Sequence, residues 1–234
     1  MNLLEVCCGN PESVAAAVAG GAPRIELCSH LEVDGLTPDW EVLRAVRHQY
    51  PTLRIHVLIR PRAGDFHYTV KEIDRMARDI ETALDLGADG VVSGALSAKG
   101  DVDNSPMLDL TCAASEWGTF HDKEPAFTFH RAFDRVRSPF DALETIIMLG
   151  CDRILTSGQA PTAAEGTDLL RELQLRAGGE LLILPGGGVT PQNARRILEL
   201  SGCREIHASA SKNLPDGRKV TSARKVSQIM DAIR

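Results

Sequence analysis

The chain has 234 residues, of which 43% are hydrophobic and 25% are charged, and its formal net charge is −6 at pH 7. These values are typical of a globular protein, and no stretch is basic enough to predict a nucleic-acid or anionic-membrane surface. The first ten residues have neither a positive region nor a long apolar run, and no segment reaches the roughly 18 apolar residues of a membrane span. We therefore expect no signal peptide and no contact with a membrane.

The six cysteines are expected to be free thiols rather than disulfides. They form no CxxC pair, and in a cytosolic chain of this length free thiols are expected. They are Cys7, Cys8, Cys28, Cys112, Cys151 and Cys203.

Short apolar runs rich in β-branched residues alternate with amphipathic segments from one end of the chain to the other. The runs predict eight strands, at residues 3–7, 24–28, 54–60, 90–96, 126–131, 153–157, 180–186 and 205–209. The amphipathic segments predict helices at 11–21, 37–49, 69–87, 138–150, 162–178, 190–202 and 222–234, several opening with Pro and closing with Gly.

Eight such units of about 29 residues each predict an α/β fold, a single (β/α)₈ TIM barrel that spans residues 1–234 as one domain. A doubly wound open sheet is the alternative, but it rarely needs eight units of such regular length. No linker or low-complexity segment interrupts the pattern.

Strand alternation then assigns polar side chains to the inside of the barrel. Because buried charges are costly unless paired, Glu5, Arg24 and Glu26 are expected to form an ion network low in the barrel. His56 is expected to be a hydrogen-bonded core histidine. Nearer the mouth, where barrel active sites lie, we expect Cys7, Cys28, Arg60, His130, Ser157, His207 and Ser209.

Two segments that follow predicted strands carry candidate catalytic and anion-binding groups. In RPRAGDFHY, the guanidinium groups of Arg60 and Arg62 suit a carboxylate or phosphate, unless the segment is a plain solvated loop. In FHRAFD, His130 is a candidate general acid or base that Asp134 could orient, and the alternative is a structural hydrogen-bonded pair. Glu26 is a further candidate for proton transfer.

The segment LPGGGVTPQN predicts an anion site. Its glycines, Gly186, Gly187 and Gly188, leave backbone amides free to approach a phosphate or carboxylate, and a predicted helix start follows. Barrels often bind phosphate after the seventh and eighth strands, where Ser209 also lies. A tight turn without a ligand is the alternative.

Cys7 and Cys28 end neighbouring predicted strands, so their sulfurs could share one soft metal ion. Two thiolates suit Cu(I). The alternative is a pair of small buried hydrophobic residues, since free cysteine is often simply buried.

The chain resembles the CutC family of copper homeostasis proteins. The matching stretches run in order through almost the whole chain, and they are LEVCC (4–8), RIELC (24–28), GLTP (35–38), IRPRAGDFHY (59–68), GVVSGAL (90–96), TFHRAFD (128–134), RILTSGQ (153–159), GGGV (186–189) and EIHASA (205–210). The resemblance implies a cytoplasmic TIM-barrel protein that forms a homo-oligomer, expected here to be a dimer, with Cys7 and Cys28 as Cu(I) ligands. Two features depart from the family pattern: Asp34 stands where members often have Gly, and the loop 210–219 looks short.

Two functions follow as hypotheses. The first is Cu(I) binding in copper homeostasis, with copper as the one metal and no organic cofactor. The second is a metal-independent enzyme of the lyase or isomerase type for a small phosphorylated or carboxylated substrate. In it, Arg60 and the glycine loop hold the anion while His130 or Glu26 moves a proton, and Glu5, Ser157 and His207 complete the mouth. The sequence does not decide whether the protein is an enzyme.

Overall fold

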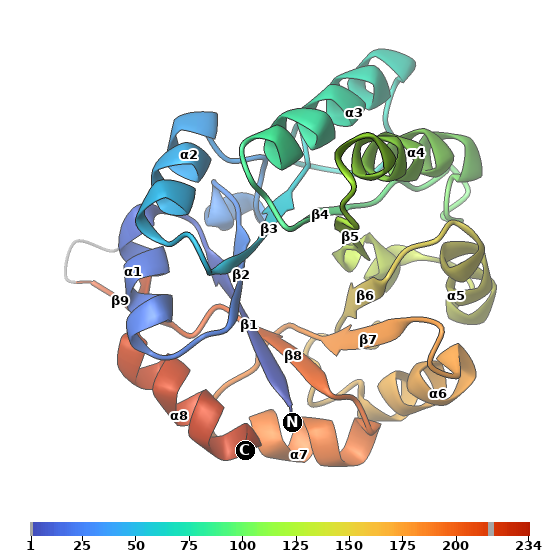
Figure 1. Cartoon of the computed structure of the whole chain (residues 1–234). Coiled ribbons are helices and arrows are strands. Elements are labelled where there is room, and N and C mark those ends of the chain that lie inside the picture. The colour runs from blue at the N-terminus through green and yellow to red at the C-terminus, as the bar shows by residue number, and fades with distance from the viewer. Residues whose placement is uncertain (1, 215–217) are drawn as a thin grey trace.

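The structure, a computed structural model, describes residues 2–214 and 218–234. Eight parallel strands surrounded by helices form the TIM barrel predicted from the sequence (Figure 1). The strand order is β7-β6-β5-β4-β3-β2-β1-β8, and its two end strands, β7 and β8, lie in contact with each other. The strands are β1 (Leu3–Cys8), β2 (Arg24–Leu27), β3 (Arg54–Leu58), β4 (Gly90–Ser93), β5 (Ala126–Phe129), β6 (Arg153–Thr156), β7 (Leu182–Pro185) and β8 (Glu205–Ala208).

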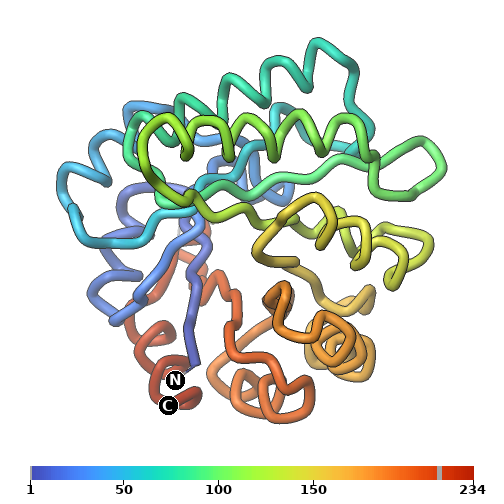
Figure 2. The backbone as a smooth tube through the Cα atoms, turned by 45° about the vertical axis from the view of Figure 1, so that its right-hand side comes forward, coloured from blue at the N-terminus to red at the C-terminus, as the bar shows by residue number. Residues whose placement is uncertain are grey.

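The helices lie outside the strands, and Figure 1 and Figure 2 both show the N- and C-termini close together. The helices are α1 (Pro11–Ala19), α2 (Trp40–Gln49), α3 (Val70–Asp85), α4 (Asn104–His121), α5 (Pro139–Met148), α6 (Thr167–Ala177), α7 (Ala194–Ser201) and α8 (Ala223–Ile233). Two 3₁₀ turns, η1 (Leu31–Val33) and η2 (Arg131–Arg135), follow β2 and β5. In the described part of the chain, no helix is both long and apolar enough to cross a bilayer.

Outward-facing strand residues pack under the helices and form the main core. Val6, Ile25 and Ile55 are fully buried there, at neighbouring positions of β1, β2 and β3. The same alternation turns Glu5, Arg24 and His56 toward the barrel axis, where they contact one another. Strand register therefore separates an apolar outer core from a polar interior, as the sequence predicted.

Helix α4 was not predicted from the sequence. Its buried residues Met107, Leu110, Ala114 and Trp117 have helical spacing, but the exposed Phe120 blurs the apolar stripe. The hairpin formed by β9 (Ser211–Asn213) and β10 (Lys219–Thr221) was not predicted either. Part of the loop 210–219, which looked short in sequence, lies outside the described residues at 215–217.

Three helices begin later than the sequence predicted. Helix α2 begins at Trp40 rather than at 37, and Asp39 is its N-cap. Helix α6 begins at Thr167 rather than near residue 162, and α7 begins at Ala194 rather than at 190. Before α7, the Thr190 amide donates to the Asn193 side chain within a turn. The glycine loop is therefore followed by a turn and not directly by a helix N-terminus.

Candidate functional site at the barrel mouth

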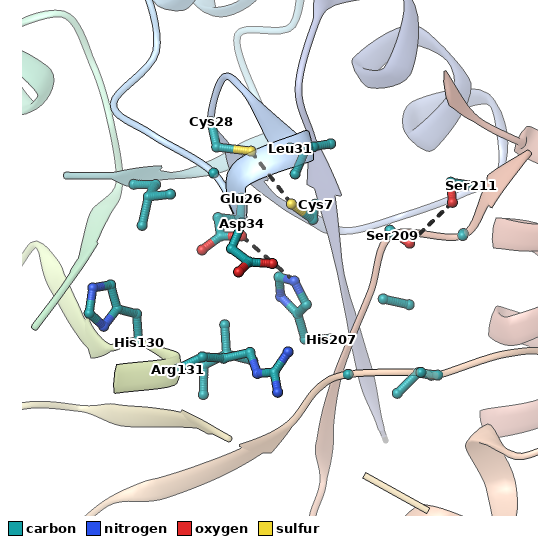
Figure 3. Close-up of a pocket in the computed structure, with 18 of the residues that line it drawn as sticks. Cys7, Glu26, Cys28, Leu31, Asp34, His130, Arg131, His207, Ser209 and Ser211 are labelled. Carbon is teal, nitrogen blue, oxygen red and sulfur yellow. Dashed lines mark hydrogen bonds and ion pairs between the residues drawn. The ribbon is translucent and has the colours of Figure 1, made fainter. Parts of the chain in front are cut away.

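A cavity of about 640 Å³ lies at the carboxyl ends of the strands. Residues from five strands, β1, β2, β3, β6 and β8, and from the loops after β2, β3, β5, β7 and β8 line it. Figure 3 places His207 and His130 on different sides, with Cys7 and Cys28 together beyond His207. Barrel enzymes and ligand-binding barrels use this end of the fold. The cavity is therefore the candidate functional site.

A network of four charged side chains, of which three are buried and Arg153 is half-buried, closes the barrel below the cavity. Nε of Arg24 lies 2.5 Å from Oε2 of Glu5, and its Nη2 lies 2.5 Å from Oε2 of Glu205. Nε of Arg153 lies 2.9 Å from the same Glu205 oxygen. Two cations thus balance two carboxylates, which confirms the expected floor network for Glu5 and Arg24 and adds two members that sequence reasoning did not select.

The register of β1 explains why Glu5 is the centre of this network. Glu5 pairs with Arg24 on one side and with His207 on the other. Although burial alone raises its pKa, hydrogen bonds with His207 and His56 and the charge of Arg24 hold the pKa of Glu5 well below its ordinary value. Glu5 is thus a fixed carboxylate beneath the mouth.

His207 links this floor to the cavity. Its Nδ1 lies 2.9 Å from Oε1 of Glu5, and its Nε2 lies 3.6 Å from Oε2 of Glu26 (Figure 3). Burial lowers the pKa of His207, but its contacts with Cys7, Glu5 and Glu26 outweigh this and raise the pKa well above the ordinary value. Burial raises the pKa of Glu26, which lines the cavity rather than joining the floor network.

Cys7 and Cys28 face each other at the buried end of the cavity. Their sulfurs are 3.5 Å apart, and the Cys28 thiol also lies 3.6 Å from the backbone oxygen of Cys8. Contact with Cys28, followed by burial, raises the pKa of Cys7 well above its ordinary value. Both side chains thus lie where one soft ion could contact both sulfurs.

His130 lies on a different side of the cavity, under Phe66, whose ring centroid is 4.8 Å away. Its Nδ1 accepts a hydrogen bond of 3.2 Å from the amide of Ala132, and its buried Nε2 has no hydrogen-bond partner among the described residues. Burial and the charge of Arg60 lower the pKa of His130 to about 3. The ring is therefore neutral near pH 7, which weakens its case as a general acid or base there.

Asp134, proposed from the sequence to orient His130, instead fixes the loop after β6. Its Oδ1 accepts hydrogen bonds from the Thr156 hydroxyl at 2.5 Å and the Ser157 amide at 3.0 Å, and its Oδ2 accepts one from Arg131. The Ser157 hydroxyl donates to the backbone oxygen of Ala160 at 2.6 Å. Asp134 and Ser157 thus shape the rim, and the spacing of His130 and Asp134 in the sequence did not indicate their separate partners.

The two arginines after β3 have different surroundings. Arg60 is buried in the cavity lining and donates to the backbone oxygens of Val33, Gly35 and Gly64, so it joins the loops that follow β2 and β3. Arg62 instead pairs with Glu72 at 2.6 Å and Asp65 at 2.9 Å on the outer side of the loop.

The predicted anion loop lines the cavity in part. Gly187 and Gly188 are lining residues with φ of +99° and +70°, a conformation that favours glycine. The Gly186 amide donates to the backbone oxygen of Thr156, and a Cβ at this position would lie 2.6 Å from Leu155. Ser209 lies exposed at the rim with its hydroxyl 3.4 Å from that of Ser211 (Figure 3).

The comparisons with known proteins agree on one family. The model of the CutC family matches residues 2–212. A family protein CutC from Chromobacterium violaceum is 46% identical over 208 residues, which are 89% of this chain and 81% of that protein. A copper homeostasis protein cutC homolog from Homo sapiens is 44% identical over 217 residues, which are 93% of this chain and 76% of the relative.

Solved structures agree with the fold. A CutC structure from Streptococcus agalactiae has a TM-score of 0.82 at 28% identity and covers 89% of this chain and 99% of its own. An N-(5'-phosphoribosyl)anthranilate isomerase from Pyrococcus furiosus has a TM-score of 0.61 at 10% identity, covering 100% of this chain and 98% of its own. The second likeness shows the barrel fold alone.

Proposed function

This chain belongs to the CutC family of copper homeostasis proteins, and on that premise we propose that it binds Cu(I) through the thiolates of Cys7 and Cys28. The observation that carries the proposal is the 3.5 Å separation of the two sulfurs at the buried end of the cavity. Six free cysteines fit a reducing compartment, so we place the protein in the cytoplasm.

The chemistry of the two side chains suits this metal. Cu(I) is soft, prefers sulfur ligands and is selected by thiolates. Both sulfurs lie in the cavity lining, so an ion entering from the mouth reaches them without opening the barrel. Metal binding must displace the thiol protons, which the high pKa of Cys7 otherwise retains.

Competition with a chromophoric Cu(I) chelator under anaerobic, reducing conditions tests the proposal. Cys7→Ser and Cys28→Ser should each weaken Cu(I) binding by roughly 100-fold or more, since even changes behind the ligands cost 10–100-fold in metal affinity. The exposed Cys112 supplies the control, and Cys112→Ser should bind Cu(I) like the wild type. Wild-type affinity in the Cys7→Ser/Cys28→Ser double variant would contradict the site.

A second function is favoured by the charge of the cavity. Arg60 is a buried cation whose guanidinium contacts backbone oxygens, and no ion pair described for the chain joins it to a carboxylate. A buried charge without a counter-charge is costly, so a small anionic ligand would stabilise it. On this proposal the protein is an enzyme of the lyase or isomerase type, with Glu26 as the proton-transfer group.

Binding of inorganic phosphate and of small phosphorylated and carboxylated compounds, measured by calorimetry, tests this second function. Ser209→Asp adds a carboxylate at the exposed rim and should weaken binding by about 10-fold or more through like-charge repulsion. Ser115→Asp makes the same change on α4, outside the cavity, and should bind like the wild type. Absence of binding to the wild type would remove support for an anionic substrate.

The oligomeric state is a separate proposal. Family membership leads us to expect a homo-oligomer, most simply a dimer. Light scattering of the purified chain measures this directly, and a monomeric mass at micromolar concentration would contradict it.

A further inference from the structure

We propose that Cys7, Glu26 and His207 form a second metal site, suited to a divalent ion of the zinc type. This site shares Cys7 with the Cu(I) pair but needs two other ligands and does not need Cys28. It therefore goes beyond the proposed copper function and can be separated from it by mutation.

The three residues come from adjacent strands. Cys7 pairs in register with Glu26 of β2, and Glu5, two residues before Cys7 on the same face of β1, pairs with His207 of β8. Their sulfur, carboxylate oxygen and ring nitrogen all lie within 4.8 Å of one another, and all three residues are buried. Figure 3 shows these side chains meeting at one end of the cavity.

These separations are close to those of a tetrahedral zinc complex. Zn–N, Zn–O and Zn–S bonds of about 2.0–2.3 Å imply ligand-to-ligand distances of roughly 3.3–3.6 Å. The Nε2 of His207 and Oε2 of Glu26 are already 3.6 Å apart. An ion between them requires only that the Cys7 sulfur move inward by up to about 1 Å, within the reach of side-chain rotation.

The histidine is held in the orientation that a metal ligand needs. Its Nδ1 lies 2.9 Å from Glu5, and Glu5 is itself fixed by Arg24 at 2.5 Å. Histidines that bind metals usually donate the second ring N–H to a carboxylate in this way, which leaves Nε2 for the ion. In this barrel Nε2 is the nitrogen that faces Glu26.

The charge count favours a divalent ion over Cu(I) at these three ligands. A thiolate, a carboxylate and a neutral imidazole carry two negative charges, which a divalent ion cancels in a buried position. The charges beneath are already balanced, with Arg24 and Arg153 against Glu5 and Glu205. Cu(I) would leave one uncompensated negative charge and gains little from a hard carboxylate ligand.

The fourth coordination position of this ion would be open. All three ligands line the cavity of about 640 Å³, so a tetrahedral ion bound to them has its remaining position on the cavity side. Three protein ligands and one open position are the pattern of catalytic rather than structural zinc sites. The expected fourth ligand is water or an oxygen of a small anionic molecule.

Titration of the full chain with Co²⁺, in the presence of a non-thiol reductant, tests the site. The wild type should develop the visible bands of four-coordinate Co²⁺ together with a near-ultraviolet band of thiolate-to-cobalt charge transfer, and Zn²⁺ should displace the cobalt one for one. Cys7→Ser should lose the charge-transfer band. Glu26→Gln and His207→Asn should weaken Co²⁺ binding by about 10-fold or more, because each removes one ligand.

Matched variants keep this test separate from the copper test. In His207→Asn the amide can still donate to Glu5 while the ligand nitrogen is lost, so the floor network stays satisfied. Cys28→Ser should bind Co²⁺ within about 3-fold of the wild type but lose Cu(I), whereas Glu26→Gln and His207→Asn should keep Cu(I). The charge-transfer band of the wild type shows by itself, without any variant, whether a thiolate binds the cobalt ion.

Three results would overturn the proposal. The first is a wild-type cobalt spectrum without the thiolate-to-cobalt band. The second is Co²⁺ affinity equal to that of the wild type in both Glu26→Gln and His207→Asn. The third is a loss of Co²⁺ affinity in Cys28→Ser that is as large as the loss in Cys7→Ser. The last result would assign any divalent ion to the two sulfurs instead. None of these results depends on whether Cu(I) binds, so the two sites can fail separately.

Discussion

The floor and the mouth of this barrel differ in how their buried charges are matched, although among the described residues each region holds a buried nitrogen without a hydrogen-bond partner, such as Arg153 Nη1 on the floor. On the floor, Arg24 contacts Glu5 and Glu205 at 2.5 Å each, and its charge is fully matched. At the mouth, His130 has a buried Nε2 and Arg60 a buried Nε with no hydrogen-bond partner among the described residues. The two regions are separated by only a few residues along each strand.

The contrast separates a stabilising function from a binding function. Buried polar groups in proteins are almost always satisfied, so each exception needs a reason. On the floor the paired charges fix the register of neighbouring strands. At the mouth the unmatched groups surround a cavity, where a ligand could satisfy them.

Arg24→Met gives the largest expected effect, because it leaves the buried carboxylate of Glu5 without its cation and leaves Glu205 with Arg153 alone. Breaking a buried pair from one side typically costs about 3–5 kcal/mol, so the free energy of unfolding should fall by about that amount. Urea denaturation followed by circular dichroism measures it.

Arg44→Met is the matched control, because Arg44 pairs with Glu41 on the exposed face of α2. Exposed pairs are worth about 0–1 kcal/mol. Equal losses in the two variants would show that the floor network does not stabilise the barrel.

His130→Asn tests the mouth and should alter the pH dependence of stability. Because burial lowers the pKa of folded His130 from 6.5 to about 3, the unfolded chain binds a proton in that pH range and the folded chain does not. The contribution of neutral, buried His130 to stability is fully present above about pH 6.5 and is lost progressively as the pH falls toward 3. At pH 5 the wild type should lose about 2 kcal/mol from this residue alone, relative to pH 7.5.

Asparagine is the informative replacement, because its side-chain oxygen can still accept the Ala132 amide that Nδ1 accepts in the wild type. The difference in unfolding free energy between wild type and variant, measured at several pH values, removes contributions common to both. That difference should change by about 2 kcal/mol between pH 7.5 and 5. A constant difference would mean that His130 titrates normally in the folded protein.

The fold could be predicted from the sequence because eight strand patterns alternate with seven helical patterns along the chain. Strand alternation also placed Glu5, Arg24 and His56 inside correctly, since one register assigns every side chain of a strand to a face. Helix α4 was missed because exposed apolar residues such as Phe120 obscure its buried stripe. The later start of α7 depended on a local turn at Thr190 that apolar spacing does not encode.

Pairings across the barrel were harder to predict. Glu205 and Arg153 belong to the floor network, but their partners lie on strands far apart in sequence. Asp134 seemed to serve His130 because the two are close in sequence, whereas the turn η2 directs its carboxylate to the loop after β6. Closeness in sequence therefore does not predict the partner of a side chain that lies in a turn. Strand register does predict which face of the sheet a strand residue occupies.

Asp34 gives the smallest expected effect and sharpens the account of the mouth. It is exposed at the cavity rim with φ +66° and ψ +22°, a left-handed conformation that glycine adopts freely and that Asp tolerates better than most residues. Glycine would therefore adopt this backbone without strain. Asp34→Gly should change the free energy of unfolding by less than about 0.5 kcal/mol, since relief of strain is offset by the entropy of glycine in the unfolded chain. Asp34→Ala should lower it by about 1 kcal/mol, because a Cβ without a compensating polar group pays the left-handed cost. Denaturation of the two variants side by side measures the difference. If Asp34→Ala were as stable as Asp34→Gly, backbone conformation would not be what limits this position, and the carboxylate itself would need a role at the rim.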